Sequence, residues 1–441
     1  MEPPLSVSRP PKRLPSAPPR LSVSDTPTAP SRLAWLDALR GIAALVVAFD
    51  HSSYTFMAEF RRELMPQFNT SRYAIMVFFL VSGYIIPASL ERRGRIRTFW
   101  IGRIFRIYPL CAAAVTAVLA LHLAGVAQIR DDFGRQSAAT VVLAHVTLLQ
   151  EVLGTRDLLL VLWTLSYEMA FYLLVVALFT VRLHQRSAAV AVTLGVFAAV
   201  SGTAGGMVAS SALSGAIGTG PLIVFASIIL VVAICCASSG SPALRVFGGV
   251  LGGVLALVLV LFNGTVPMWE GLVILAVMFL GTVVYRADTG RSSWWCAAST
   301  AAVVVSCAVG SAYAHSRGTE YTRRGWIVAF LLAVLTFGAG LAWRHRRIPR
   351  WLTGLGTISY SVYLVHPVLL AVIDGLFGRW RRDEVVLEVA FFAVLLPLCV
   401  LTHRCIEAPS QALGRKLARH VDPPVKGTHD ERCAQAPPAS S

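Results

Sequence analysis

Residues 33–51, LAWLDALRGIAALVVAFDH, form an apolar stretch that carries Arg40 near its middle and ends in Asp50 and His51. A charged side chain near the centre of a bilayer costs about 2.5–3.5 kcal/mol on insertion scales, so a membrane helix that retains one is expected to use it. Arg40 and His51 are eleven residues apart, which in an α-helix is three turns plus about 20°, with a rise of about 16 Å. The stretch therefore predicts one membrane helix with both side chains on one face.

The composition places the whole chain among polytopic membrane proteins. Hydrophobic residues make up 56% of the 441 residues, charged residues make up 14%, and the mean hydropathy is +0.65. A soluble domain of this length is not so apolar. The net charge is +16, but the basic residues fall in the short links between apolar runs, which is typical of membrane topology and argues against nucleic acid as a partner.

Apolar runs long enough to cross a bilayer recur along the chain. We count about twelve, at 33–51, 74–90, 107–125, 157–181, 188–209, 218–237, 245–262, 268–285, 296–314, 326–343, 354–375 and 384–404. The segment 138–152 is apolar but short, which favours a re-entrant or interfacial piece. The expected fold is all-α, a polytopic integral membrane bundle of about 10–12 transmembrane helices.

The basic residues also predict the orientation and the division of the chain. With the N-terminus inside, inner segments hold 26 of the 39 Lys and Arg residues, outer links hold 12, and Arg40 lies in the membrane. This bias predicts a multi-pass protein of the cell membrane (the inner or plasma membrane) with both termini in the cytoplasm. We expect a disordered basic arm at 1–31, a membrane domain at 32–416 and a disordered tail at 417–441.

Two short patterns place polar groups near apolar runs. The second run contains Ser82, Gly83 and Tyr84, for which a helix contact or a mild kink is the structural alternative to a ligand site. Arg103 and Arg106 follow in the next link, three residues apart and so on one helix face. A positive-inside loop explains some basic residues there, yet two guanidiniums presented together suit a phosphate ligand.

Further ionisable residues occur in other runs. Glu168 is expected near mid-depth in the fourth run, where an ionised carboxylate needs a partner or a role; an ion pair with Arg40 is as consistent with its position as direct chemistry. In the eleventh run, Ser359, then Val362 or Tyr363, and then His366 fall on neighbouring turns of one face. A lone buried histidine is more often a structural residue, but this combination favours a polar functional cavity.

Metal and redox chemistry have no support in the sequence. The eight cysteines include no C-x-x-C pair, and the ten histidines show no metal-ligand spacing. We therefore expect no metal and no permanently bound cofactor.

Six motifs in order give the chain a resemblance to the acyltransferase 3 family of membrane acyl-CoA-dependent O-acyltransferases. They are Arg40 with His51 (R-x10-H), 78–84 (F-F-x-x-S-G-[FY]), 103–109 (R-x-x-R-I-x-P), 163–172 (W-S-L-x-x-E-x-x-F-Y, with Thr164 in place of Ser), 359–366 (S-Y-x-x-Y-L-x-H) and 404–409 with Glu407 and Pro409 (E-x-P). The resemblance covers about residues 32–416.

The resemblance implies that an acyl group, acetyl by default, moves from acyl-CoA to a hydroxyl of a sugar, a glycan or a glycosylated natural product. The acyl-CoA is then a co-substrate, and the lipid bilayer is the surrounding partner. Arg103 and Arg106 would hold the coenzyme A phosphates. The acyl arm would reach toward Ser82, Glu168 and His366, with Ser82, Gly83 and Tyr84 as part of the donor site.

The catalytic roles follow from the chemistry of the side chains. His51 is the expected general base, because imidazole titrates near neutrality. Arg40 would stabilise developing negative charge or bind the donor. Glu168 would orient a histidine or pair with Arg40, and His366 would be a second base or a hydrogen-bond partner.

Two departures from the family pattern accompany the resemblance. The family has about ten core spans, whereas we count about twelve. The pattern does not require Asp50, and because adjacent helix residues do not face each other we do not propose an Asp50–His51 dyad.

The competing class is a proton-coupled transporter or an acyl-group exporter, since intramembrane Arg, Glu and His residues also serve such proteins. Against it, the two halves of the chain show no similarity and no matching pair of broken helices. The polar residues also gather in the first four runs and the eleventh. We therefore favour the acyltransferase.

Overall fold

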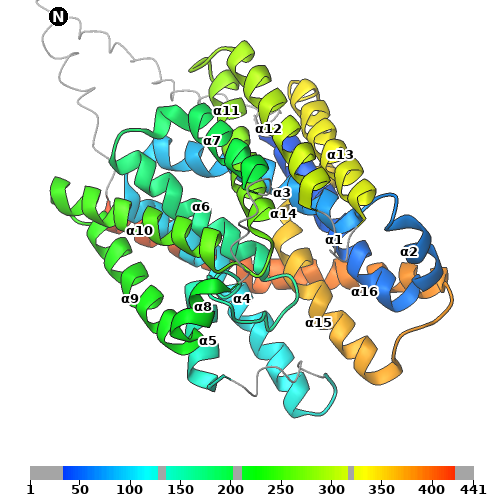
Figure 1. Ribbon diagram of the computed structural model, residues 1–441. Coiled ribbons are helices and arrows are strands. Elements are labelled where there is room, and N and C mark those ends of the chain that lie inside the picture. The colour runs from blue at the N-terminus through cyan, green and yellow to red at the C-terminus, as the bar shows by residue number, and fades with distance from the viewer. Residues whose placement is uncertain (1–32, 128–135, 202–210, 316–321, 423–441) are drawn as a thin grey trace, which may run out of the picture.

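The chain folds as a bundle of helices. The computed structural model describes residues 33–127, 136–201, 211–315 and 322–422. Within these ranges 82% of the residues are helical and none forms a strand, which confirms the predicted all-α polytopic membrane fold (Figure 1). The long helices are α1 (Ala34–Phe56), α3 (Thr70–Arg93), α4 (Ile96–Leu123), α6 (Trp163–Thr180), α7 (Ser187–Val200), α9 (Thr219–Ala237), α10 (Pro242–Phe262), α11 (Met268–Asp288), α12 (Trp294–His315), α13 (Arg323–Ala342), α15 (Ser359–Phe377) and α16 (Val385–Thr402).

Shorter helices connect these elements. They are α2 (Ala58–Leu64), α5 (Ala138–Thr147), α8 (Ala212–Ile217), α14 (Arg350–Thr357), α17 (Ala408–Val421), a 3₁₀ turn η2 (His184–Arg186) and a π-helical turn η3 (His403–Glu407). α5 has 10 residues and is about 15 Å long, too short to cross a bilayer.

Each predicted run overlaps one long helix. Ten helices in the described ranges are long and apolar enough to span a membrane, within the predicted range of ten to twelve. α1 is not among these ten helices, because Asp37, Arg40 and Asp50 make it more polar than the others. α7 has only 14 residues, and the second half of the predicted run 188–209 lies largely outside the described residues.

The core of the bundle is built on α11. This helix is 94% buried over its most apolar stretch, and it packs against α3, α7 and α12. α3 and α11 approach at the level of their backbones, because a Cβ on Gly83 would lie 1.9 Å from the Met278 carbonyl oxygen and one on Gly281 would lie 2.3 Å from that of Leu80. Small residues at such crossings are typical of membrane helix pairs.

Polar contacts tie the helix ends together at two opposite ends of the bundle. At the proximal end, where α1 begins, Thr98 donates a hydrogen bond to Asp422 (2.7 Å) and Arg344 pairs with Asp288 (2.7 Å). At the distal end, where α1 finishes, Thr55 donates to Asp374 (2.7 Å). α1 therefore runs from one end to the other.

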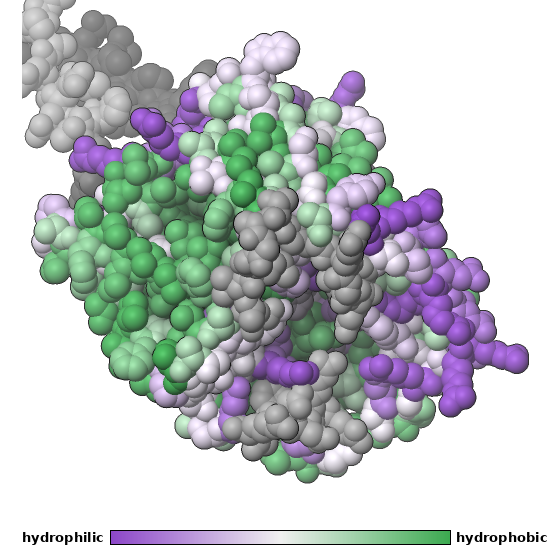
Figure 2. Space-filling view, in the orientation of Figure 1, coloured by the Kyte–Doolittle hydropathy of each residue, from purple (hydrophilic) through white to green (hydrophobic). Residues whose placement is uncertain are grey.

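The surface has an apolar region and a separate hydrophilic region (Figure 2). An apolar expanse covers α9 and α10, where Val231, Phe225 and Val254 are exposed, as expected for helices that face lipid tails. Hydrophilic side chains gather instead over α2 and the connection between α15 and α16.

The predicted terminal segments are described only in part. α17 continues to Val421, so the first residues of the segment 417–441 are helical. The arm 1–31 and residues 423–441 lie outside the described ranges.

The contact between α3 and α11 gives a test of the packing. Replacing Gly83 by Ala should destabilise the protein, because the new methyl group meets the Met278 carbonyl and overpacking costs about 1–3 kcal/mol. The measurement is the fraction of monodisperse protein that survives heating in detergent. Gly310→Ala in α12 is the matched control, because open space surrounds Gly310; equal stability of the two variants would contradict the packing described here.

Candidate active site

A cavity of about 90 Å³ lies between α1, α3, α4, α6 and α15. Arg40 enters it from α1, Ser82 from α3, Arg103 and Arg106 from α4, and Glu168 from α6. Five predicted site residues therefore meet in one cavity, although the first and the last of them, Arg40 and Glu168, are 128 positions apart in the sequence. The remaining polar lining is hydroxylic and comes from Thr164, Tyr172, Ser359, Tyr360 and Tyr363.

Positive charge predominates in this cavity. Arg103 donates to Ser89 Oγ (3.0 Å), and its guanidinium lies 5.3 Å from the ring centres of both Phe99 and Tyr172. Arg106 forms no ion pair with a carboxylate of the described ranges. The arrangement favours an anionic ligand.

Arg40 and Glu168 do not form the ion pair that the sequence left open. Arg40 instead lies 3.8 Å from Asp37, one turn earlier in α1. Glu168 Oε1 accepts a hydrogen bond from the Tyr172 hydroxyl at 2.5 Å. Both charged groups thus keep a local partner while they face the cavity.

Gly83 and Tyr84 do not reach this cavity, although the sequence grouped them with Ser82. Gly83 contacts Met278, and the Tyr84 hydroxyl donates to Asp288 (2.5 Å). Each step along an α-helix turns the side chain by about 100°, so three consecutive residues cannot share one face. Of the three, only Ser82 contributes to the cavity wall.

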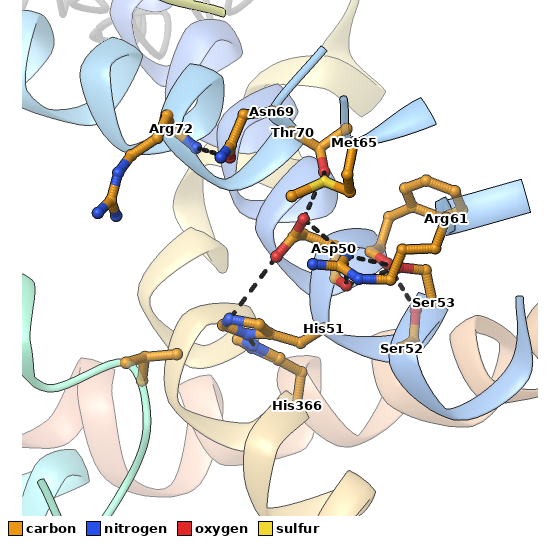
Figure 3. A network of polar contacts seen from close by, with 12 residues as sticks. Asp50, His51, Ser52, Ser53, Arg61, Met65, Asn69, Thr70, Arg72 and His366 are labelled. Atoms are coloured by element: carbon orange, nitrogen blue, oxygen red, sulfur yellow. Dashed lines mark hydrogen bonds and ion pairs between the residues drawn. The ribbon is translucent and has the colours of Figure 1, made fainter. Parts of the chain in front are cut away.

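A second polar centre lies further along α1, where two histidines meet (Figure 3). His51 Nδ1 is 2.8 Å from His366 Nε2 on α15, and the two rings stack with their centres 5.1 Å apart. His366 is fully buried, whereas the His51 side chain is 14% exposed. His51 is therefore the ring of the pair that a substrate can reach.

The backbone assigns the ring protons of this pair. His366 Nδ1 lies 2.7 Å from the Val362 carbonyl oxygen, which can only accept, so His366 Nδ1 donates. In the neutral ring His366 Nε2 then accepts, and His51 Nδ1 is its donor. This leaves the lone pair on His51 Nε2 free to take a proton.

Asp50 lies close to that nitrogen, which corrects the expectation that neighbouring helix residues stay apart. Asp50 Oδ2 is 3.9 Å from His51 Nε2 (Figure 3). Asp50 Oδ1 accepts from Arg61 at 3.0 Å and from the Thr70 hydroxyl. These contacts fix Oδ1, so Oδ2 turns toward His51.

Arg61 and Thr70 are functional candidates that the sequence did not identify. Arg61 also donates to the Asp50 carbonyl (2.9 Å) and to Ser53 Oγ (3.0 Å). Arg61 belongs to the short helix α2, and nothing in its own segment distinguishes it from other basic residues of the links. Only its contact with a buried carboxylate reveals its role.

Tyr363 connects the two centres. It lines the cavity, and its ring centre lies 6.4 Å from that of His366 one turn later on α15. Its hydroxyl contacts Thr164 and the Val161 carbonyl. The histidine pair is therefore separated from the cationic cavity by about one helix turn.

No group of three or more His, Cys, Asp and Glu side chains in the described ranges is arranged to hold a metal ion.

Comparison with known protein families matches residues 33–404 to an acyltransferase domain. The chain belongs to this acyltransferase family. The match covers α1 to α16 and so includes both polar centres, and it confirms the resemblance drawn from the six motifs. No curated protein and no solved structure matches the chain. The protein is therefore a multi-pass membrane acyltransferase.

The position of Asp50 gives a test of this centre. Asp50→Asn should lower the rate of acyl transfer by roughly tenfold or more, because a protonated His51 would lose the negative charge beside it. Asp50→Glu keeps the charge and should retain more activity. The readout is initial rate, with monodispersity in detergent as the folding check. Equal rates for the two variants would argue against an electrostatic role for Asp50.

Proposed function

We propose that the protein is a membrane O-acyltransferase that moves an acyl group, acetyl by default, from acyl-CoA to a hydroxyl of a sugar, a glycan or a glycosylated metabolite. The observation that carries this proposal is the His51–His366 hydrogen bond (2.8 Å). It presents a free imidazole nitrogen on the same helix that brings Arg40 to the cationic cavity.

The reaction follows from the proton positions in the pair. His51 Nε2 takes the proton of the acceptor hydroxyl as its oxygen attacks the thioester carbonyl carbon. The new C–O bond forms, the C–S bond breaks, and the coenzyme A thiolate receives the proton back from the imidazolium. Asp50 stabilises that imidazolium, while His366 fixes the ring orientation.

The cationic cavity suits the donor. Arg103 and Arg106 offer guanidinium groups to phosphates, and the narrow space beside Ser82 and Tyr363 suits an unbranched arm better than a bulky group. Arg40, in the same cavity, would help to bind the anionic donor, and Glu168 would orient Tyr172, which lines the path.

The proposal also includes the orientation of the proximal and distal ends of the bundle in the membrane. We place the proximal end in the cytoplasm of a cell (plasma or inner) membrane, where acyl-CoA is available, together with both termini. This agrees with the excess of Lys and Arg in the proximal links. The acceptor then approaches His51 from the distal end.

The first experiment measures acyl transfer directly. Purified protein is incubated with acetyl-CoA and a panel of sugar acceptors, and free thiol is followed. We expect acceptor-dependent thiol release that falls by about 10²- to 10⁴-fold in His51→Ala, because a positioned base contributes that much.

His345→Ala is the control for this experiment, since His345 is exposed at the proximal end. If His51→Ala and His345→Ala both keep wild-type activity, the proposed base is wrong. If the wild type consumes no acyl-CoA yet moves solutes across vesicles, the O-acyltransferase proposal fails.

The donor assignment has its own test. Replacing both Arg103 and Arg106 by Ala should weaken acetyl-CoA binding at least about tenfold, because each charge-assisted hydrogen bond contributes about 1.5–3 kcal/mol. Binding is measured by calorimetry on protein in detergent. Arg93→Ala provides the comparison, since Arg93 is exposed at the same end and does not line the cavity. Unchanged affinity in the double variant would remove Arg103 and Arg106 from the donor site.

A further inference from the structure

A second, larger cavity opens at the distal end of the bundle. Its volume is about 850 Å³, and it lies between the end of α1, the helix α2 and the connection from α15 to α16. Its wall belongs to the hydrophilic region of the surface in Figure 2. We call it the distal bowl and define it by Tyr54, Arg61, Arg62, Arg379, Trp380 and Arg381.

The wall of the distal bowl is strongly basic. Four arginines and no Asp or Glu line it within the described ranges. Arg61 pairs with Asp50 and Arg379 with Asp374. Arg62 and Arg381 are exposed and have no carboxylate of the described ranges within ion-pair distance. Like charges that line one cavity repel one another, and a bound anion would offset this repulsion.

The carboxylate nearest in sequence to Arg381 is already engaged elsewhere. Asp383 accepts from the backbone N–H groups of Glu59 (2.8 Å) and Phe60 (3.0 Å) at the start of α2. This cap holds α2 against the connection between α15 and α16, and so shapes the distal bowl. The contact leaves Arg62 and Arg381 available for an external anion.

Two aromatic rings accompany the arginines. The Arg61 guanidinium lies 3.4 Å from the centre of the Tyr54 ring, which is 44% exposed. Trp380 is fixed by its backbone N–H bond to Thr55 (2.9 Å) and by packing on Phe56. Rigid aromatic faces with a polar edge suit a ring-shaped, hydroxylated ligand.

Arg61 joins the distal bowl to the catalytic centre. The same guanidinium that contacts Tyr54 donates to Asp50, and Asp50 lies beside His51. Tyr54 in the wall of the distal bowl follows His51 by three residues in α1, so that wall begins about one helix turn from the proposed base. Topology does not explain basic side chains here, because the distal end is the one that we place outside the cytoplasm.

We propose that the distal bowl binds the acceptor through an acidic group, a phosphate or a carboxylate carried on a sugar. Arg62 and Arg381 bind the anion, while Tyr54 and Trp380 contact the sugar ring. This inference rests on the proposed acyl transfer and adds the class of acceptor to it. An anionic phospholipid headgroup offers the same charge and is the competing occupant.

The test is a binding experiment without any acyl donor. Protein in phosphatidylcholine nanodiscs is titrated with glucose 6-phosphate, glucuronate and glucose at constant ionic strength. We expect both acidic sugars to bind at least tenfold more tightly than glucose. Arg62→Gln and Arg381→Gln should each weaken the acidic sugars severalfold and leave glucose unchanged.

Arg324→Gln is the matched control, because Arg324 is exposed at the same end and does not line the distal bowl. Equal binding of glucose and the acidic sugars, or unchanged affinity in both variants, overturns the inference. A second outcome would also overturn the inference. If nanodiscs that contain phosphatidylglycerol abolish sugar binding, and if the protein retains this lipid only when Arg62 and Arg381 are present, the distal bowl binds lipid.

A kinetic measurement separates this inference from the proposed function. In acyl transfer to an acidic sugar, Arg62→Gln should raise KM and leave kcat nearly unchanged, with no effect on a neutral acceptor. Transfer to neutral sugars alone contradicts only the inference about the distal bowl. Binding of acidic sugars without any consumption of acyl-CoA contradicts only the proposed acyl transfer.

Discussion

The absence of water inside a bilayer requires every buried charge in this protein to have a partner, and the active site depends on how Asp50 meets that requirement. Arg61 and Thr70 bind one carboxylate oxygen, so the other turns toward His51. His366, held by the Val362 carbonyl, accepts from the opposite side of the His51 ring. An uncompensated charge at this depth would cost several kcal/mol. The same contacts that satisfy Asp50 therefore orient the proposed base.

Some helices form the packed core and the apolar surface, and others carry the polar groups of the candidate active site. α3 and α11 approach closely at Gly83 and Gly281 and form a rigid centre, while α9 and α10 present apolar side chains outward. The polar groups gather where α1, α4, α6 and α15 meet. A reactive centre is thus enclosed by helices whose positions are fixed by close packing and by polar contacts at their ends, which is the arrangement that keeps catalytic groups at productive distances.

The sequence predicts those features of the structure that depend on helical periodicity and on the polarity of each segment. The fold class follows from the apolar runs, and the cavity-facing positions of Arg103 and Arg106 follow from their three-residue spacing. The contact between His51 and His366 spans 315 positions, so no local pattern fixes its distance. Gly83 and Tyr84 were grouped with Ser82 through a motif, yet helical rotation turns them toward α11. The roles of Asp50 and Arg61 depend on tertiary contacts that sequence periodicity does not encode.

The continuous run of α1 past both polar centres has a consequence for how such chains can vary. Arg40 lines the cationic cavity, and His51 meets His366 eleven residues later in the same unbroken helix. Inserting or deleting one residue between them would rotate one side chain by about 100° relative to the other and shift it by about 1.5 Å. The number of residues between Arg40 and His51 in α1 therefore sets both the separation and the relative orientation of their side chains. The interval of eleven residues is therefore fixed by the geometry of the two polar centres, whereas the apolar residues between Arg40 and His51 are constrained only by packing.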